Sequence, residues 1–153
     1  MSPYDRLSAL GLELMAVPQP IGTYVAHVPV GNLVFLSGQG PREASGYLHT
    51  GKVGRDVGIE DAYAHARLTG LNLLSVLHAA TGDLRRVKRI VKLLGMVNGT
   101  PDFAEHPRVI NGCSDLFVEV FGADGQHARS AVGMDSLPGN ITVEIEVIVE
   151  LRA

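Results

Sequence analysis

The chain has 153 residues, of which 46% are hydrophobic, a length and composition that suit one domain with a substantial core. Its formal net charge of -3 argues against general electrostatic binding of nucleic acid, which needs a net basic face. The one cysteine, Cys113, excludes an internal disulfide, and no apolar run is long enough for a signal-peptide core or a membrane span, so we expect a cytoplasmic protein.

The N-terminus carries the signals of a short helix. Ser2 followed by Pro3 is typical of an N-cap and a first helical residue, and Gly11 suits a helix end. We therefore expect an extra N-terminal helix at about residues 3–14, with an apolar stripe formed by Leu7, Leu10 and Leu14. Residues 17–22, VPQPIG, contain two prolines and are not expected to form regular structure.

Two runs rich in β-branched and aromatic residues follow, at residues 23–30 and 32–38. A glycine and an asparagine lie at the junction between them, which is a hairpin signal, although Pro29 weakens it. Residues 39–54 are rich in turn formers and predict a loop with a short strand at about residues 47–49.

Three further elements show a clear period. Apolar residues recur at three- and four-residue steps over 59–80, which predicts a long helix that is stopped by Gly82. Charged and apolar residues alternate over 87–93, which predicts a strand with one wet face. A second long helix is expected over 107–122, with an apolar stripe formed by Ile110, Cys113, Phe117 and Val120.

Two strands finish the chain, at residues 129–135 and 141–151. The second alternates strictly, and its apolar face is formed by Ile141, Val143, Ile145, Val147, Val149 and Leu151. This order predicts two strand–helix–strand crossovers in one sheet with both helices on one face, that is, a two-layer α+β or α/β domain. The other face would leave a broad apolar surface wet, so we expect a homo-oligomer whose subunit grooves are candidate sites.

None of the common catalytic signatures is present. The chain has no glycine-rich phosphate loop, no HExxH, no CxxC and no GxSxG, and its six histidines are not paired at ligand spacing, so we expect no metal site. Cys113 lies on the apolar stripe of the second long helix, where an inert buried thiol is more common than a nucleophile.

Arg129 and two glutamates of the last strand are the main candidates for chemistry. Arg129 begins a strand, where it is either a solvated edge charge or a rigid fork of donors for a small carboxylate. Glu144 and Glu146 share one face of their strand. They either point to solvent or, if that face lines a subunit groove, one of them orients or deprotonates a water.

Other features also have a structural and a functional interpretation. Ser37 and Gly38 close a strand at a glycine-rich turn, whose amides either form the turn or bind an oxyanion. Tyr24 either packs or presents its hydroxyl to a cleft. One strand face is either solvated or contacts RNA through a basic run without interleaved aromatic residues, namely Arg85, Arg86, Lys88, Arg89 and Lys92.

Several segments together resemble the RidA/YjgF family, once described as translation inhibitors or L-PSP endoribonucleases. The similarity runs from Ile21 to Leu151 and is carried by IGTYVAHV, NLVFLSGQGP, GLNLL, RVKRIVKLLGMV, DFAEHPRVING and the closing ARSAVG, LP and VEIEVI. The resemblance implies a chorismate-mutase-like two-layer sandwich of α+β class, with a mixed sheet and two long helices on one face. It also implies a homotrimeric barrel with clefts between neighbouring subunits.

Members of the RidA subgroup hydrolyse reactive enamines and imines, such as 2-aminoacrylate and its 2-imino acid tautomer, to 2-keto acids and ammonia. The resemblance therefore implies a small imino or keto carboxylate as substrate. It implies no cofactor, no metal, no membrane and no nucleic acid as partner.

Six positions match functional residues of the family. Arg129 matches the arginine that salt-bridges the substrate carboxylate, and Glu144 matches the glutamate proposed to position water. The residues that match cleft-lining positions are Tyr24, Ser37, Gly38 and Asn111. We interpret residues 125–152 as one half of an inter-subunit site, to which residues 23–38 supply the other half.

Three positions depart from the common family residues. His127 stands where many members have proline, Ser114 replaces a common tyrosine, and Ala131 stands where many deaminases have cysteine. The departures leave the carboxylate anchor intact and concern the substrate range.

The leading hypothesis is hydrolysis of reactive 2-imino or enamine acids to 2-keto acids and ammonia. The first alternative is a non-catalytic binder or sensor of small carboxylates that uses the same cleft. The second is an endoribonuclease that acts through the basic run.

Overall fold

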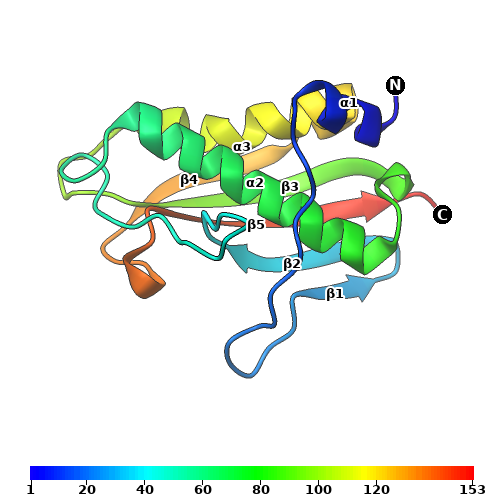
Figure 1. The fold of residues 1–153 in the computed structure, drawn as a ribbon, viewed down its shortest axis with the longest axis horizontal. Coiled ribbons are helices and arrows are strands. Elements are labelled where there is room, and N and C mark those ends of the chain that lie inside the picture. The colour runs from blue at the N-terminus through cyan, green and yellow to red at the C-terminus, as the bar shows by residue number, and fades with distance from the viewer.

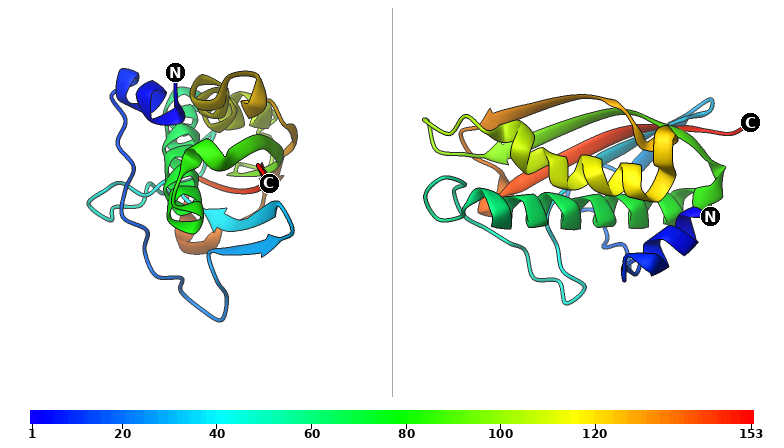
Figure 2. Two further views of the ribbon diagram at one scale, coloured as in Figure 1. Left: turned by 90° about the vertical axis from the view of Figure 1, so that its right-hand side faces the viewer. Right: turned by 90° about the horizontal axis from the view of Figure 1, so that it is seen from above.

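Two long helices lie side by side on one face of a five-stranded sheet (Figures 1 and 2). The computed structural model describes residues 1–153. The helices are α2 (Ile59–Thr81) and α3 (His106–Phe121). Helix α2 ends at Gly82 in a left-handed conformation with φ 76°, which glycine adopts without steric cost. Both predicted long helices are confirmed, and no helix of the chain combines the length and apolarity needed to cross a membrane.

The sheet is mixed, as expected, and its strand order is β1-β2-β5-β3-β4. Strands β3 and β4 are parallel, whereas β5 runs antiparallel to its neighbours β2 and β3. Both crossovers predicted from the order of elements are therefore confirmed, one through α2 and one through α3. The strands are β1 (His27–Val30), β2 (Leu33–Gln39), β3 (Val87–Asn98), β4 (Ala128–Met134) and β5 (Val143–Leu151).

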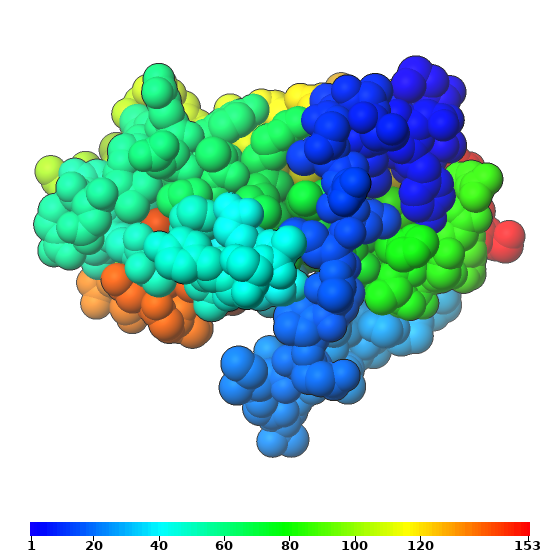
Figure 3. Space-filling model, in the orientation of Figure 1, coloured from blue at the N-terminus to red at the C-terminus, as the bar shows by residue number.

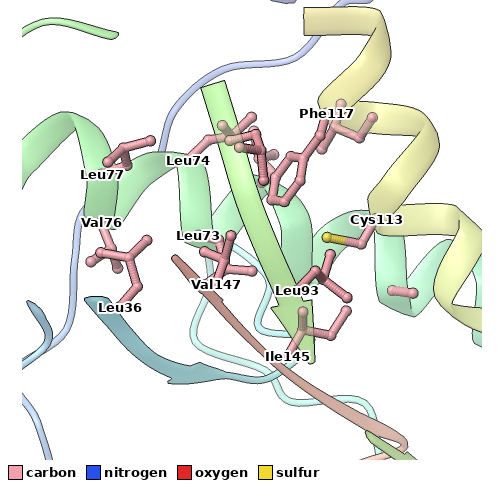
Figure 4. Packing of buried hydrophobic residues seen from close by; sticks show 14 of the residues in the cluster. Leu36, Leu73, Leu74, Val76, Leu77, Leu93, Cys113, Phe117, Ile145 and Val147 are labelled. Atoms are coloured by element: carbon pink, nitrogen blue, oxygen red, sulfur yellow. The ribbon is translucent and has the colours of Figure 1, made fainter. Parts of the chain in front are cut away.

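The central strand β5 carries much of the core, because alternate residues along a strand point to opposite faces. The buried face of β5, which packs under the helices, is formed by Val143, Ile145, Val147, Val149 and Leu151. In the close view, Ile145 and Val147 lie in one cluster with Leu73 of α2 and Phe117 of α3 (Figure 4). The strict alternation predicted from the sequence is confirmed, although Ile141 lies before the strand.

The opposite face of the sheet has no helix over it (Figure 2). Large apolar side chains on this open face are exposed, among them Val28, Val30, Phe35 and Val132. A groove of about 500 Å³ crosses it, lined by Val28, Phe35, Ser37, Lys92, Leu94 and Glu146 together with parts of β2 and β5. The predicted uncovered apolar surface is thus present in the single chain.

Strand β1 begins four residues later than the start predicted at residue 23. Its pairing with β2 stops at His27 and Leu36, and β2 shifts its register to β5 between Leu36 and Gln39. Apart from the hydrogen bond between the Ser37 N–H and the Ala26 carbonyl, residues before His27 therefore lack a regular strand partner in spite of their β-branched side chains. The short strand expected at 47–49 is reduced to isolated bridges.

Pro29 lies in β1, at one edge of the sheet. The Ser37 N–H donates to the Ala26 carbonyl at 2.9 Å, and hydrogen-bonded and non-hydrogen-bonded pairs alternate along an antiparallel ladder. The pair of Pro29 and Val34 is therefore non-hydrogen-bonded, and the proline nitrogen points away from β2. This explains why a proline, which weakens the hairpin signal, is compatible with the observed hairpin.

The N-terminal helix α1 (Pro3–Ala9) begins as predicted, with Ser2 and Asp5 forming a capping box. It is shorter than the predicted span 3–14, because the chain turns at Leu10 and at Gly11, whose φ is 69°. Leu7 alone of the predicted stripe is buried. The chain after α1 then crosses the outer face of α2 on its way to β1 (Figure 3).

Tyr4 ties α1 to the body of the protein. Its hydroxyl oxygen lies 3.0 Å from His78 Nδ1 and accepts a hydrogen bond from the Leu84 N–H at 2.8 Å. The guanidinium of Arg85 lies 5.4 Å from the centre of the Tyr4 ring. The N-terminal helix is therefore anchored to the C-terminal end of α2, which is distant from it in the sequence.

Helices α2 and α3 touch backbone to backbone at Gly112. A Cβ atom at this position would overlap the Tyr63 carbonyl and would lie 2.9 Å from the Arg67 nitrogen. Two polar contacts across the same pair of helices join Tyr63 Oη to Asp115 at 2.6 Å and Arg67 to Glu119 at 2.8 Å. The small residue in α3 thus sets the distance between the two helices.

Candidate functional site

Arg129 lies on β4, opposite Leu93 of β3. Leu93 is buried under the helices, so the side chain of Arg129 points to the helix-covered side of the sheet edge. Its Nη1 donates to Ser114 Oγ at 3.0 Å and its Nη2 to the Pro107 carbonyl at 3.4 Å. Both partners belong to α3, which therefore holds the half-buried guanidinium against the end of the sheet.

His127 completes a chain of contacts with Arg129. Its Nε2 lies 2.9 Å from Ser114 Oγ, and its Nδ1 lies 2.7 Å from the Gly125 carbonyl oxygen. Burial lowers the pKa of His127; the hydrogen bond to Gly125 opposes this shift, and the charge of Arg129 adds to it. We call Arg129, Ser114 and His127 the arginine group.

Glu144 lies on the open face, opposite Met96 of β3. Its carboxylate covers Gly38, where a Cβ atom would come within 2.6 Å of Glu144 Oε2. Burial raises the pKa of Glu144, and the neighbouring Glu146 raises it further. A residue with a side chain at position 38 would therefore collide with this carboxylate, and glycine leaves the space that the carboxylate occupies.

Ser37 lies in the groove of the open face, which Glu146 also lines, and its side chain contacts the segment that carries Tyr24. Ser37 Oγ donates to the Val25 carbonyl at 2.6 Å, which fixes the segment that carries Tyr24. The Tyr24 side chain itself is exposed, and it precedes β1 rather than starting the strand. We call Tyr24, Ser37, Gly38 and Glu144 the glutamate group.

The predicted division of the site is wrong in one respect. The sequence predicts that Glu144 and Arg129 lie in the same half of the site, because both belong to residues 125–152, but strand β3 separates β4 from β5. In addition, Arg129 shares the side of Leu93, whereas Glu144 shares the open face with Met96. Within one chain, Glu144 therefore belongs with the residues of the 23–38 segment, and Arg129 forms a separate group.

Asn111 of α3 takes part in neither of the two groups. It lines a shallow hollow on the outside of the helical layer together with Ile59, Glu60, Tyr63 and Arg108. Ala131, one of the departures from the family pattern, pairs with Gly95 on the helix side of β4.

The basic run and Cys113 are the two remaining candidates from the sequence. In the basic run, Lys88 and Arg89 both pair with Glu150, at 3.1 and 2.8 Å, and Arg85 pairs with Asp83 at 3.1 Å. Cys113 is fully buried, and burial raises the pKa of its thiol far above the ordinary value. The solvated interpretation of the strand and the inert interpretation of the thiol are the ones that these contacts favour.

Sequence reasoning missed the connection between Ser114, His127 and Arg129. In the sequence, Ser114 and His127 stand out only as two separate departures from a family pattern. Their contact depends on where α3 lies on β4, and no fixed spacing along the chain encodes that. The available signal was the coincidence of two polar departures near the same arginine.

Comparison with known proteins identifies relatives over nearly the whole chain. Residues 4–151 match the family described as "YjgF/chorismate_mutase-like, putative endoribonuclease". Protein TCP17 of Trypanosoma cruzi is 43% identical over 148 residues, which cover 96% of this chain and 92% of the relative. The 2-iminobutanoate/2-iminopropanoate deaminase of Escherichia coli K12 is 33% identical over 135 residues, which cover 88% of this chain and 92% of the relative.

Solved structures agree with this assignment. The crystal structure of a protein from Shewanella oneidensis, described as "a putative endoribonuclease", superposes with a TM-score of 0.95 at 36% identity, covering 99% of this chain and 100% of the other. The α+β architecture with a mixed sheet and an N-terminal helix is thus shared with a solved relative over its full length.

Proposed function

The chain belongs to the RidA/YjgF family, and on that premise we propose that it hydrolyses 2-imino acids and their enamine tautomers to 2-keto acids and ammonia. The observation that carries the proposal is the state of Arg129. This half-buried arginine takes part in no ion pair within the chain, although a guanidinium in such a position favours a carboxylate partner. A relative 33% identical is named 2-iminobutanoate/2-iminopropanoate deaminase.

We place the reaction between subunits of a homotrimer. The arginine group and the glutamate group lie on different sides of one sheet, so a site that uses both needs residues from two chains. The exposed apolar side chains of the open face support association through that face, and the resemblance to the family supports three copies. Tyr24, Ser37, Gly38 and Asn111 are proposed as the remaining substrate contacts.

The proposed chemistry divides between a cation and a carboxylate. Arg129 binds the substrate carboxylate and orients the neighbouring imine carbon. Glu144 accepts a proton from a water as the water oxygen bonds to that carbon, and the proton passes on to the nitrogen, which gives a neutral tetrahedral carbinolamine. The hydroxyl proton of the carbinolamine then passes to the nitrogen through Glu144, the carbon–nitrogen bond breaks, and ammonia leaves as the keto group forms. Because free imines hydrolyse in water unaided, holding and orienting the substrate supplies much of the required acceleration.

An assay of ammonia release tests the proposal directly. An amino-acid oxidase generates 2-iminobutanoate or 2-iminopropanoate in place, and ammonia is followed with and without this protein. We expect release to be accelerated in proportion to the amount of protein added. If 2-keto acids raise the melting temperature of the protein while ammonia release stays at the buffer rate, the protein is a carboxylate binder and the hydrolase proposal fails.

The pH dependence of the reaction should report on Glu144. The carboxylate form accepts the proton, and its pKa is raised by burial and by Glu146. Activity should therefore fall on acidification at a higher pH than an ordinary glutamate would give. In Glu146→Gln the repulsive charge is removed, so the pKa of Glu144 falls and the acid limb of kcat should move to lower pH.

The matched control for this test is Glu13→Gln, which neutralises an exposed glutamate elsewhere and should leave the acid limb in place.

Glu144→Gln should lower kcat by about a hundredfold, within the range of general acid–base contributions. An acid limb that keeps its position in Glu146→Gln would assign it to a group other than Glu144.

A further inference from the structure

The contacts of Ser114 and His127 define a directed chain of hydrogen bonds that ends on Arg129. The Gly125 carbonyl oxygen is an acceptor only, so we assign the proton of the His127 ring to Nδ1, which lies 2.7 Å from it. In the neutral ring, Nε2 is then an acceptor, and the Ser114 hydroxyl donates its one proton to it across 2.9 Å. Ser114 Oγ is left with lone pairs, and Arg129 Nη1 donates to them at 3.0 Å.

This series of hydrogen bonds orients Arg129 and leaves most of its N–H donors without a partner. A guanidinium has five N–H donors, and α3 receives one from Nη1 and one from Nη2. The remaining three, which are the Nε–H and one N–H on each Nη, have no hydrogen-bond partner within the chain. With no carboxylate of the chain paired to it, the guanidinium is held in a fixed orientation by neutral partners alone.

We propose that Ser114 and His127 are positioning residues, which hold the Arg129 guanidinium in the orientation that binds the substrate carboxylate, and that they do so only while His127 is neutral. The inference rests on the proposed function of Arg129. It assigns a common role to two positions that otherwise look like unrelated departures from the family pattern.

The groups that contact His127 include one cation and no carboxylate, so the contacts suit the neutral form of its ring. The charged group that faces it is Arg129 of β4. From α3 it meets the uncharged Ser114 hydroxyl and the ring of Phe117, with ring centres 6.0 Å apart, and from η2 (Gly122–Gly125) it meets the Gly125 carbonyl. Asp124, the acidic residue of η2, lies 3.8 Å from Arg152 instead.

A second proton on His127 would therefore disrupt the chain in two ways. Nε2 would become a donor, so Ser114 would lose the acceptor that directs its hydroxyl. The imidazolium would also lie next to the guanidinium, and the repulsion between the two positive charges would push the guanidinium out of the orientation that Ser114 sets. Binding of a carboxylate should accordingly weaken as His127 becomes protonated.

The test measures binding of 2-oxobutanoate by calorimetry, in parallel with KM and kcat for 2-iminobutanoate. In Ser114→Ala we expect Kd and KM to rise about tenfold, the effect of losing one hydrogen bond to a charged group, with kcat nearly unchanged. Ser114→Thr keeps the hydroxyl and should stay close to the original protein. Ser8→Ala, which removes an exposed serine from α1, is the matched control.

The pH series separates positioning from a merely structural role. For the original protein, Kd should rise as the pH falls through the lowered pKa of His127. In His127→Gln the side chain offers an acceptor that does not titrate, so this rise should disappear. Thermal unfolding of each variant, at equal protein concentration, shows whether the fold is intact.

Each result decides the question. An unchanged Kd in Ser114→Ala, or an acid rise in Kd that persists in His127→Gln, overturns the positioning role and leaves the proposed hydrolysis untouched. If the original protein binds 2-oxobutanoate without hydrolysing imines, the hydrolase proposal fails and the positioning role is decided by Kd alone. A protein that neither binds nor hydrolyses these compounds overturns both.

Discussion

Replacing Arg129 with alanine is expected to lower kcat/KM for 2-iminopropanoate by about two to three orders of magnitude. Removing one partner of a hydrogen-bonded charge pair costs about 2–5 kcal/mol, and each 1.4 kcal/mol corresponds to about a factor of ten. Most of the loss should appear in KM if Arg129 acts as an anchor, and in kcat as well if it also sets the angle of the imine carbon.

Arg129→Lys refines this experiment, because lysine keeps the charge but loses the fork of donors. We expect it to recover only part of the activity. Arg55→Ala removes an exposed arginine of the loop before α2 and should behave as the original protein does. An Arg129→Ala variant that hydrolyses the imine at the original rate, with its fold and assembly unchanged, would show that the anchor lies elsewhere.

The largest effect on stability should come from Gly112→Ala. The added methyl group would overlap the Tyr63 carbonyl. This carbonyl belongs to the backbone of a long helix, which cannot move aside as a flexible side chain can. Overpacking in a core costs about 1–3 kcal/mol and occasionally more. We expect a cost at the upper end of this range, which should lower the midpoint of thermal unfolding by about 6–12 °C for a domain of this size.

Gly58→Ala is the control for that change. Gly58 precedes α2 with φ -83°, and a Cβ there would meet nothing within 4 Å, so the substitution should cost no more than about 1 kcal/mol. Equal unfolding midpoints for the two variants would mean that α2 and α3 can separate at little cost, contrary to the contact at Gly112.

The elements that could be predicted from the sequence are those whose period is imposed by burial. Apolar and polar residues alternate along β5 because one of its faces is buried under the helices. Helix α2 has an apolar stripe for the same reason. The start of β1 could not be predicted in this way. Thr23 and Val25 favour a strand, but pairing also requires a partner, and the regular pairing of β1 with β2 ends at His27, beside the point where β2 shifts its register to β5.

The candidate site was predictable residue by residue but not as an arrangement. A resemblance to a family marks Arg129 and Glu144, yet it does not say that they lie on different sides of the sheet. That fact follows from the register of β3, which places Leu93 beside Arg129 and Met96 beside Glu144. The contact of Ser114 with His127 similarly depends on how α3 lies on β4, which no local pattern encodes.

The position of Pro29 has a consequence for how the chain avoids wrong partners. The single folded chain exposes both an apolar face and the free edges of a sheet, and another molecule can associate with either. At the β1 edge, the nitrogen that points outward carries no hydrogen, so a foreign strand added there would lack a donor in the middle of a four-residue strand. Growth of the sheet by strand addition is thereby discouraged on that side, which leaves the apolar open face as the surface through which the proposed homotrimer would form.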